Sequence, residues 1–325
     1  MARIALRAGV DLGGTKIQAI VVDGAHAQVG QARLPTPTSG GPDAVVESLA
    51  ESVREACRDA GAGVEQLIGI GLGSPGSIDA AKGTVAGAKN LSGWPDTPVP
   101  VASKLARALG VDVPVRVAND VDVATHAEFE LGAAAEHDSL LGVFWGTGVG
   151  GGVILGGKQW NGRGSAGEIG HMVVVQNGRR CPCGRKGCME AYAGRGAMEA
   201  RARHLHEEKH RDTKLFEIMG ERGRSRLTSG IWFRAVERGD ELALELLEEA
   251  VGAIGAAAAS AVNLLDPAAV VIGGGLGIRF GEPWVEKIRQ AMMPHLFRDD
   301  EPPPIALAAL GDLGGALGAA LLVAQ

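Results

Sequence analysis

No run of Lys or Arg forms a stripe in this sequence, and its 325 residues carry a formal net charge of −6. Because no stripe of Lys or Arg forms, the charge pattern does not favour binding to nucleic acid. No apolar run that is free of charged and turn residues reaches the length of a membrane span. The N-terminal stretch Met1–Val10 lacks the apolar core and cleavage site of a secretory signal peptide. We therefore expect a cytoplasmic protein with no membrane or nucleic-acid partner.

Cysteine is scarce: the chain has four, and three of them lie close together at Cys181, Cys183 and Cys188. This pattern argues against a disulfide framework and for a reducing compartment. The three thiols, with His171 upstream, have the ligand types and the loop spacing that tetrahedral zinc prefers. The simplest interpretation is a closed structural zinc site that staples a loop.

Glycine, in contrast, is abundant, with 50 residues, much of it in clusters that indicate tight turns near ligands. Apolar residues make up 46% of the chain and charged residues 22%, as in proteins that bury a sizeable core. The length is sufficient for two lobes of roughly 100–200 residues each.

Apolar runs between turn residues predict an α/β protein in which one layout occurs twice. Each half opens with a strand, a Gly-rich turn that contains a threonine, and a second strand; the turns are Asp11–Lys16 and Gly146–Gly152. Two matched halves suggest a duplicated domain with a ligand cleft between the copies. The expected strands cover residues 3–10, 17–22, 66–72, 113–118, 140–145, 153–155, 270–272 and 305–308. The expected helices cover residues 42–60, 101–109, 121–135, 201–211, 241–265, 284–293 and 311–322.

The two Gly-rich turns are candidate phosphate sites, because glycine lets backbone N–H groups approach a phosphate closely. A plain hairpin turn explains either one alone, but two matched turns favour a nucleotide. Gly71–Gly76 and Gly146–Gly151 also fit the dinucleotide pattern G-x-G-x-x-G. Neither is followed by a helix, so we do not expect a nicotinamide oxidoreductase. The Walker A pattern is absent as well.

Four carboxylates lie in or beside the predicted turns and strand ends, where they could take part in binding or catalysis. Asp120 follows Asn119 at the end of a predicted strand, where it could take a proton from a hydroxyl group or simply cap the next helix. Asp11, beside the first turn, could support Mg²⁺ directly or through water. Glu168 and Glu190 flank the metal-ligand segment, either as plain loop carboxylates or as site residues that the metal holds in place.

These segments form an ordered set of motifs, which are Asp11–Lys16, Gly73–Gly76, Asn119–Asp120, Gly146–Gly152, Gly167–His171, Cys181–Glu190 and Val271–Gly275. In composition and order they resemble the ROK (repressor, ORF, kinase) family, most closely its bacterial glucokinases. The resemblance extends from Asp11 to the closing segment Gly311–Gly318. It implies an actin/hexokinase-like (RNase H-like) fold of two lobes, one of residues 1–119 plus about 311–325 and the other of residues 120–310.

The resemblance also assigns roles to residues. It makes Asp120 the catalytic base for a sugar 6-hydroxyl group and His171 a zinc ligand whose second ring nitrogen faces the sugar. The implied sugar-binding residues are Asn90, Asn119, Asp120, Glu168, His171 and Glu190. The implied nucleotide-binding residues are Asp11, Gly13, Gly14, Thr15, Lys16, Gly146, Thr147, Gly148, Gly274 and Gly275. The implied ligands of a structural Zn²⁺ are His171, Cys181, Cys183 and Cys188, and ATP would bind with Mg²⁺.

The combined prediction is a glucokinase of glycolysis that phosphorylates glucose with ATP and forms a homodimer or homotetramer. N-acetylglucosamine, N-acetylmannosamine, mannose and fructose stay open as substrates, and polyphosphate stays open as donor. A ROK-type transcriptional regulator is less favoured, because the first predicted strand starts at about residue 3 and leaves no room for a preceding DNA-binding domain.

Overall fold

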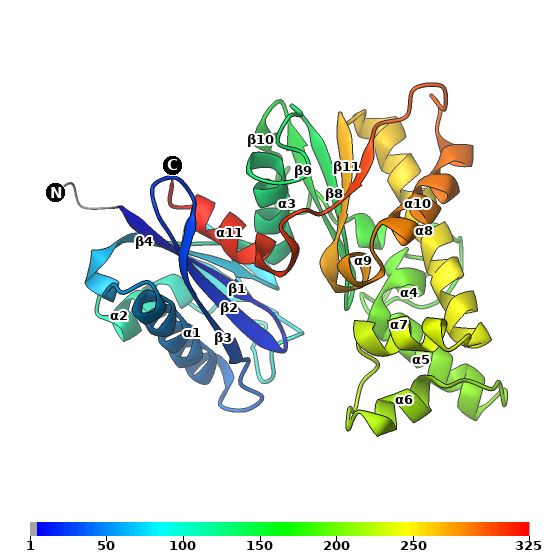
Figure 1. Cartoon of the computed structure of the whole chain (residues 1–325), viewed down its shortest axis with the longest axis horizontal. Coiled ribbons are helices and arrows are strands. Elements are labelled where there is room, and N and C mark those ends of the chain that lie inside the picture. The colour runs from blue at the N-terminus through cyan, green and yellow to red at the C-terminus, as the bar shows by residue number, and fades with distance from the viewer. Residues whose placement is uncertain (1–4, 325) are drawn as a thin grey trace. The chain divides into compact units, whose positions relative to one another are not determined.

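A computed structural model describes residues 5–324 of the chain (Figure 1). The chain forms two compact units: the first extends to Leu131 and resumes at Asp312, and the second comprises Gly132–Gly311. The sequence-based division placed residues 120–131 in the second lobe. The structure keeps them in the first unit because the helix they form packs against other elements of that unit.

The first unit is built on a five-stranded sheet in the order β3-β2-β1-β4-β7. β2 pairs antiparallel with β1 and β3, whereas β4 runs parallel to both β1 and β7. The strands are β1 (Leu6–Leu12), β2 (Lys16–Val22), β3 (Gln28–Pro35), β4 (Leu67–Ser74) and β7 (Val115–Asn119). The expected strand over residues 3–10 thus continues to Leu12, and its residues 3 and 4 lie outside the described range.

Helices cover both faces of this sheet (Figure 1). α1 (Gly41–Asp59) and α2 (Val101–Leu109) lie on one face, and α3 (Asp120–Glu130) and α11 (Gly314–Leu321) lie on the other. α11 lies so close to the sheet that a Cβ at Gly71 would stand 1.7 Å from the Ala319 carbonyl oxygen. The smaller elements are η1 (Val64–Gln66), the antiparallel pair β5 (Ser77–Asp79) and β6 (Thr84–Ala86), and η4 (Gly311–Leu313).

The second unit repeats the first sheet's pattern of strand directions in the order β10-β9-β8-β11-β12. β9 pairs antiparallel with β8 and β10, and β11 runs parallel to β8 and β12. The strands are β8 (Leu140–Trp145), β9 (Val149–Leu155), β10 (Lys158–Gln159), β11 (Ala269–Gly273) and β12 (Ile305–Leu307). The predicted duplication is confirmed. The expected turn over residues 146–152 is shorter, however, since β9 already begins at Val149.

The second unit holds the long helix α8 (Glu241–Leu265), whose N-cap residue Asp240 accepts a 2.8 Å hydrogen bond from the backbone N–H of Ala243. The segment of residues 195–237 forms three helices. The helix expected over residues 201–211 instead covers residues 195–207. The helical elements are η2 (Ile169–His171), α4 (Glu190–Ala193), α5 (Arg195–Glu207), α6 (Leu215–Glu221), α7 (Ser229–Glu237), α8 (Glu241–Leu265), α9 (Gly274–Phe280), α10 (Glu282–Met292) and η3 (Met293–His295). In the described part of the chain, no helix is both long and apolar enough to cross a membrane.

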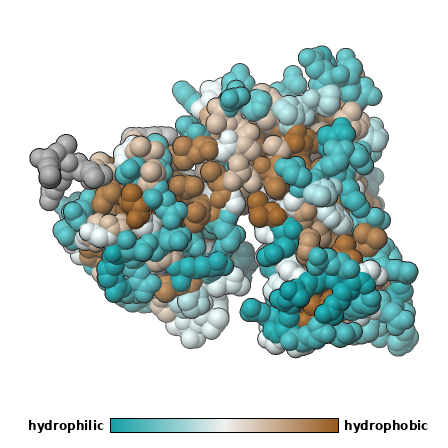
Figure 2. Space-filling model, viewed as in Figure 1, coloured by the Kyte–Doolittle hydropathy of each residue, from teal (hydrophilic) through white to brown (hydrophobic). Residues whose placement is uncertain are grey.

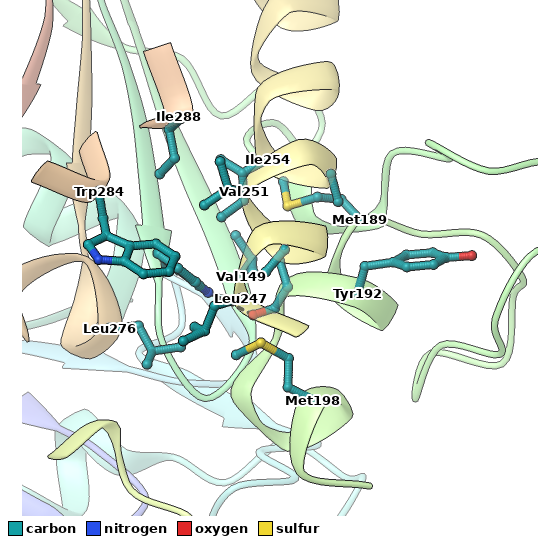
Figure 3. Close-up of a cluster of buried hydrophobic side chains, with 14 of the residues drawn as sticks. Val149, Met189, Tyr192, Met198, Leu247, Val251, Ile254, Leu276, Trp284 and Ile288 are labelled. Carbon is teal, nitrogen blue, oxygen red and sulfur yellow. Dashed lines mark hydrogen bonds between the residues drawn. The ribbon is translucent and has the colours of Figure 1, made fainter. Parts of the chain in front are cut away.

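The core of the second unit anchors the segment that carries the metal-ligand motif. Met189 and Tyr192, just after Cys188, are buried, and they lie beside α8 in Figure 3. The Trp145 indole at the end of β8 donates a 2.7 Å hydrogen bond to the Ala193 carbonyl oxygen. The end of β8 and α4 are therefore fixed to each other.

Candidate functional site

In the first unit, polar residues gather where parallel strands end. Asn119 ends β7 and is the N-cap of α3, because its side-chain oxygen accepts hydrogen bonds from the backbone N–H groups of Val121 (2.9 Å) and Asp122 (3.3 Å). The capping role considered for Asp120 thus belongs mainly to Asn119. Asp120 is the first residue of the helix, and its Oδ1 accepts a 3.0 Å bond from the N–H of Val121.

Asp11 lies near Asp120, and this proximity changes its ionisation. Burial raises the pKa of Asp11 to about 7, and the charge of Asp120 contributes in the same direction, whereas Lys16 opposes it. A Cβ at Gly315 would stand 2.8 Å from the Asp11 carboxyl carbon, so α11 lies directly against this side chain. Two carboxyl groups this close favour a bound proton or a cation between them.

The first Gly-rich turn is held by a neighbouring strand end. The Gly13 N–H donates to the Lys16 carbonyl oxygen (2.9 Å), and the Thr36 hydroxyl donates to the Gly13 carbonyl oxygen (2.6 Å). Gly14 and Thr15 are exposed at its tip. Lys16 is not a free charge, because its Nζ lies 3.3 Å from an Asp312 carboxylate oxygen.

Asn90 lies beside this first turn. A Cβ at Gly14 would stand 2.8 Å from the Asn90 carbonyl oxygen and 3.2 Å from its Cβ. The structure thus places Asn90, predicted as a sugar-binding residue, against a residue predicted to bind phosphate.

The second Gly-rich turn, Gly146–Gly148, is closed by a 2.9 Å hydrogen bond from the Gly146 N–H to the Gly148 carbonyl oxygen. A Cβ at Gly146 would stand 3.8 Å from the Gly275 nitrogen, and one at Gly274 would stand 2.5 Å from the Trp145 carbonyl oxygen. All five residues predicted in this unit to bind the nucleotide therefore gather at the ends of β8 and β11.

The side chains of His171, Cys181, Cys183 and Cys188 also meet, with one ligand atom of each within 4.8 Å of the others. The Sγ atoms of Cys183 and Cys188 lie 3.7 Å apart, and Cys181 Sγ lies 3.7 Å from His171 Nδ1. A tetrahedral zinc with bonds of about 2.3 Å to sulfur requires sulfur atoms about 3.8 Å apart. The geometry therefore fits a Cys₃His zinc site.

The two glutamates beside this cluster differ in their surroundings. Glu168 is exposed, and its carboxylate lies 3.8 Å from Nε2 of His171, the ring nitrogen that faces away from Cys181. Glu190 is partly buried, and its Oε2 accepts a 2.9 Å bond from the N–H of Val149, directly after the Gly-rich turn. Its Oε1 lies 3.8 Å from Cys181 Sγ. Glu190 therefore links the metal-ligand loop to the turn.

Two arginines of the site were not predicted. Arg179 makes a bidentate ion pair with Glu249 of α8, with both bonds 2.7 Å long, and it supports the loop before Cys181. Arg195 donates a 2.7 Å hydrogen bond to the Thr147 hydroxyl oxygen. The sequence signal for Arg195 was its position shortly after Glu190, directly before the highly charged segment of residues 196–230.

Comparisons with known proteins show the family and the fold of this chain. The sequence profile of the ROK family matches residues 7–325. A glucokinase from Thermotoga maritima is 31% identical over 322 residues, covering 98% of this chain and 96% of that protein. An N-acetyl-D-glucosamine kinase from Pectobacterium atrosepticum is 32% identical over 326 residues, covering 97% of each chain. The crystal structure of a ROK family glucokinase from Streptomyces griseus, in complex with glucose and AMPPNP, superposes with a TM-score of 0.82 at 31% identity, covering 98% of this chain and 99% of that one.

Proposed function

Because this chain belongs to the ROK family and has its actin-like two-lobe fold, we propose that it is an ATP-dependent sugar kinase, and specifically a glucokinase. The observation that carries the proposal is the similarity over 98% of the chain to a glucokinase that binds glucose and AMPPNP. The gathering of the predicted phosphate-turn residues within each unit supports the same reaction.

The proposal assigns the binding of the hexose to six polar residues, of which Asp120 is the catalytic base. Asp120 receives the proton of the 6-hydroxyl group while the hydroxyl oxygen forms a bond to the γ-phosphorus and the bond from that phosphorus to the β-phosphate bridging oxygen breaks. The products are the sugar 6-phosphate and ADP. The residues that we propose to bind the sugar hydroxyl groups are Asn90, Asn119, Glu168, His171 and Glu190.

Phosphoryl transfer depends mainly on positioning and on neutralising phosphate charge. We propose that the turns Gly13–Lys16 and Gly146–Gly148 hold the phosphates with backbone N–H groups, with Gly274 and Gly275 near the adenosine. Mg²⁺ bound with ATP would neutralise charge on the β- and γ-phosphates. The carboxylate of Asp11 suits such a hard cation, directly or through water.

The zinc that fits the Cys₃His cluster has a structural role in this proposal. Four protein ligands complete a tetrahedral set, so no coordination position is left for substrate. Its effect is to fix the loop that carries His171 and Glu190, which we propose to bind the sugar. A metal-bound histidine directs its second ring nitrogen to a defined partner, and in this proposal the partner is a sugar hydroxyl group.

A second candidate is a kinase of N-acetylhexosamines, which is favoured by the 32% identity to an N-acetyl-D-glucosamine kinase over 97% of the chain. Assays of ADP release with glucose, N-acetylglucosamine, N-acetylmannosamine, mannose and fructose distinguish the two. We expect the highest kcat/KM with glucose, because buried polar groups left unpaired by another sugar reduce binding strongly. A higher kcat/KM with an N-acetylated sugar would replace glucose in the proposal, and no turnover with any of these sugars would reject it.

A further inference from the structure

Arg195 connects the start of α5 to the second Gly-rich turn through both its backbone and its side chain. Its N–H donates to the Gly146 carbonyl oxygen (3.1 Å), and the next N–H, of Gly196, donates to the Thr147 carbonyl oxygen (3.0 Å). Its guanidinium donates to the Thr147 hydroxyl oxygen at 2.7 Å. The side chain of Arg195 is therefore held at the tip of the turn.

A second guanidinium lies at the same place. A Cβ built on Gly196 would stand 3.7 Å from the Thr147 carbonyl oxygen and 4.0 Å from Nη2 of Arg226. Arg226 reaches this position from the loop before α7 and is fixed by a 3.2 Å bond from its Nε to the buried carboxylate of Glu199. Its Nη2 thus lies close to Gly196, whose N–H bonds to the turn, while its Nε is occupied.

The positive charge at this point exceeds the local negative charge. Glu199 also accepts bonds from Arg203 (3.0 Å) and from the backbone N–H of Leu227 (3.0 Å), so its carboxylate is shared. Within the described residues, no acidic side chain forms an ion pair with Arg195. Burial and the charge of Arg226 lower the pKa of Arg195 and the charge of Glu199 opposes them, although guanidinium groups stay protonated. Two like charges that repel each other are stabilised by an anion between them.

We infer that Arg195 and Arg226 form a binding site for the phosphate chain of the phosphoryl donor, on the second unit at the turn Gly146–Gly148. This inference rests on the proposed kinase function and names a part of its donor site. The shared ligand chemistry is a chain of phosphate groups, which ATP or an inorganic polyphosphate can supply. The surface around α5–α7 is mainly hydrophilic in Figure 2, in keeping with a charged ligand.

The bond between Arg195 and Thr147 also fixes the direction of the threonine hydroxyl. A guanidinium has no acceptor, so the Thr147 oxygen must accept and its own O–H stays available as a donor. A phosphate oxygen is the acceptor that suits this hydroxyl. Planar guanidinium groups also match phosphate geometry better than ammonium groups do, which explains arginine rather than lysine at both positions.

The test is calorimetric binding of ATP, ADP, AMP and inorganic tripolyphosphate to the full chain, without sugar, for wild type and for Arg195→Ala and Arg226→Ala. Removing one charge-assisted hydrogen bond costs about tenfold or more in affinity. We expect at least this loss for ATP, a comparable loss for tripolyphosphate and little change for AMP. Arg195→Lys should restore part of the loss. The matched control is Arg224→Ala, which removes an exposed charge from the same segment.

The outcomes distinguish ATP from inorganic polyphosphate as the ligand. They also distinguish a failure of this inference from a failure of the proposed function. Loss of tripolyphosphate binding with unchanged ATP binding would assign the site to an inorganic polyphosphate donor. Equal losses for ATP and AMP, or no loss for either polyanion, would overturn the inference while the sugar assays still stand. If no sugar is phosphorylated, the proposed function fails, but the binding series still decides whether the arginines hold a phosphate chain.

Discussion

Replacement of Asp11 by Asn tests the electrostatics at the carboxyl ends of the strands in the first unit. Burial and the nearby Asp120 raise the pKa of Asp11 from 3.8 to about 7, although Lys16 acts against them. An amide has almost the same shape as the carboxyl group but cannot ionise. The variant therefore removes the cost of holding a charge at this position and leaves the packing against Gly315 in place.

The sign of the effect follows from proton binding. Between pH 3.8 and about 7 the folded protein keeps a proton on Asp11 that the unfolded chain releases. The contribution of Asp11 to stability is therefore complete below pH 3.8 and is lost as the pH rises to about 7. A pKa of about 7 instead of 3.8 corresponds to about 4 kcal/mol as an upper value. Since the side chain is partly exposed, solvent screening reduces this value, and we expect about 2 kcal/mol.

Urea unfolding of wild type and Asp11→Asn, measured from pH 5 to pH 8 without nucleotide or Mg²⁺, gives the free energy difference directly. The advantage of the variant should grow with pH and level off above about pH 7. Asp96→Asn is the matched control, because it makes the same change at an exposed residue of the same unit. A difference that is independent of pH, or a variant less stable than wild type at pH 8, would refute this reasoning.

Three further variants test the site. Asp120→Ala should lower kcat at least about 100-fold, as expected for loss of a general base, with an unchanged circular dichroism spectrum; activity close to wild type would exclude this role. Cys183→Ala should lower zinc affinity more than about tenfold, measured as zinc per chain after dialysis, and should lower the unfolding midpoint; a wild type without zinc would contradict the assignment. Gly148→Ala places a Cβ 2.2 Å from the Glu190 carboxylate, so this flexible side chain must leave the N–H of Val149. We expect about 1–3 kcal/mol lower stability and weaker glucose binding, and unchanged values for both would disprove the link.

The sequence could predict those parts of the fold that rest on local patterns. Buried strands such as β1, β4, β8 and β11 are apolar runs that end at glycines or polar residues, and all four were predicted within a few residues. The cysteine spacing likewise gave the metal-ligand cluster, because the ligands are close in sequence and glycines at 184 and 187 allow the positive φ angles of the loop. In both cases the information is contained within a short segment.

Contacts between distant segments could not be predicted in this way. α3 follows a strand in either arrangement. Its packing on α11, from the far end of the chain, and on β4 and β7 places it in the first unit. Residues 196–230 carry many charges, so their sequence predicted only one helix, over residues 201–211, whereas the structure has α5, α6 and the start of α7 there. The pKa of Asp11 depends on Asp120, which a separate strand brings close. Each of these features is a tertiary contact without a local signature.

Glu190 shows how these two kinds of information combine at the metal-ligand loop. Its place two residues after Cys188 suggested a site residue that the metal holds in place. In the structure its Oε2 bonds to the N–H of Val149, and the same segment continues through Gly194 to Arg195, whose guanidinium reaches Thr147. A disturbance of the metal-ligand loop is therefore passed to the Gly-rich turn by a side chain and by a short stretch of backbone. Because both connections end at the turn, the metal-ligand loop supports the turn proposed to bind phosphate as directly as it supports the residues proposed to bind the sugar.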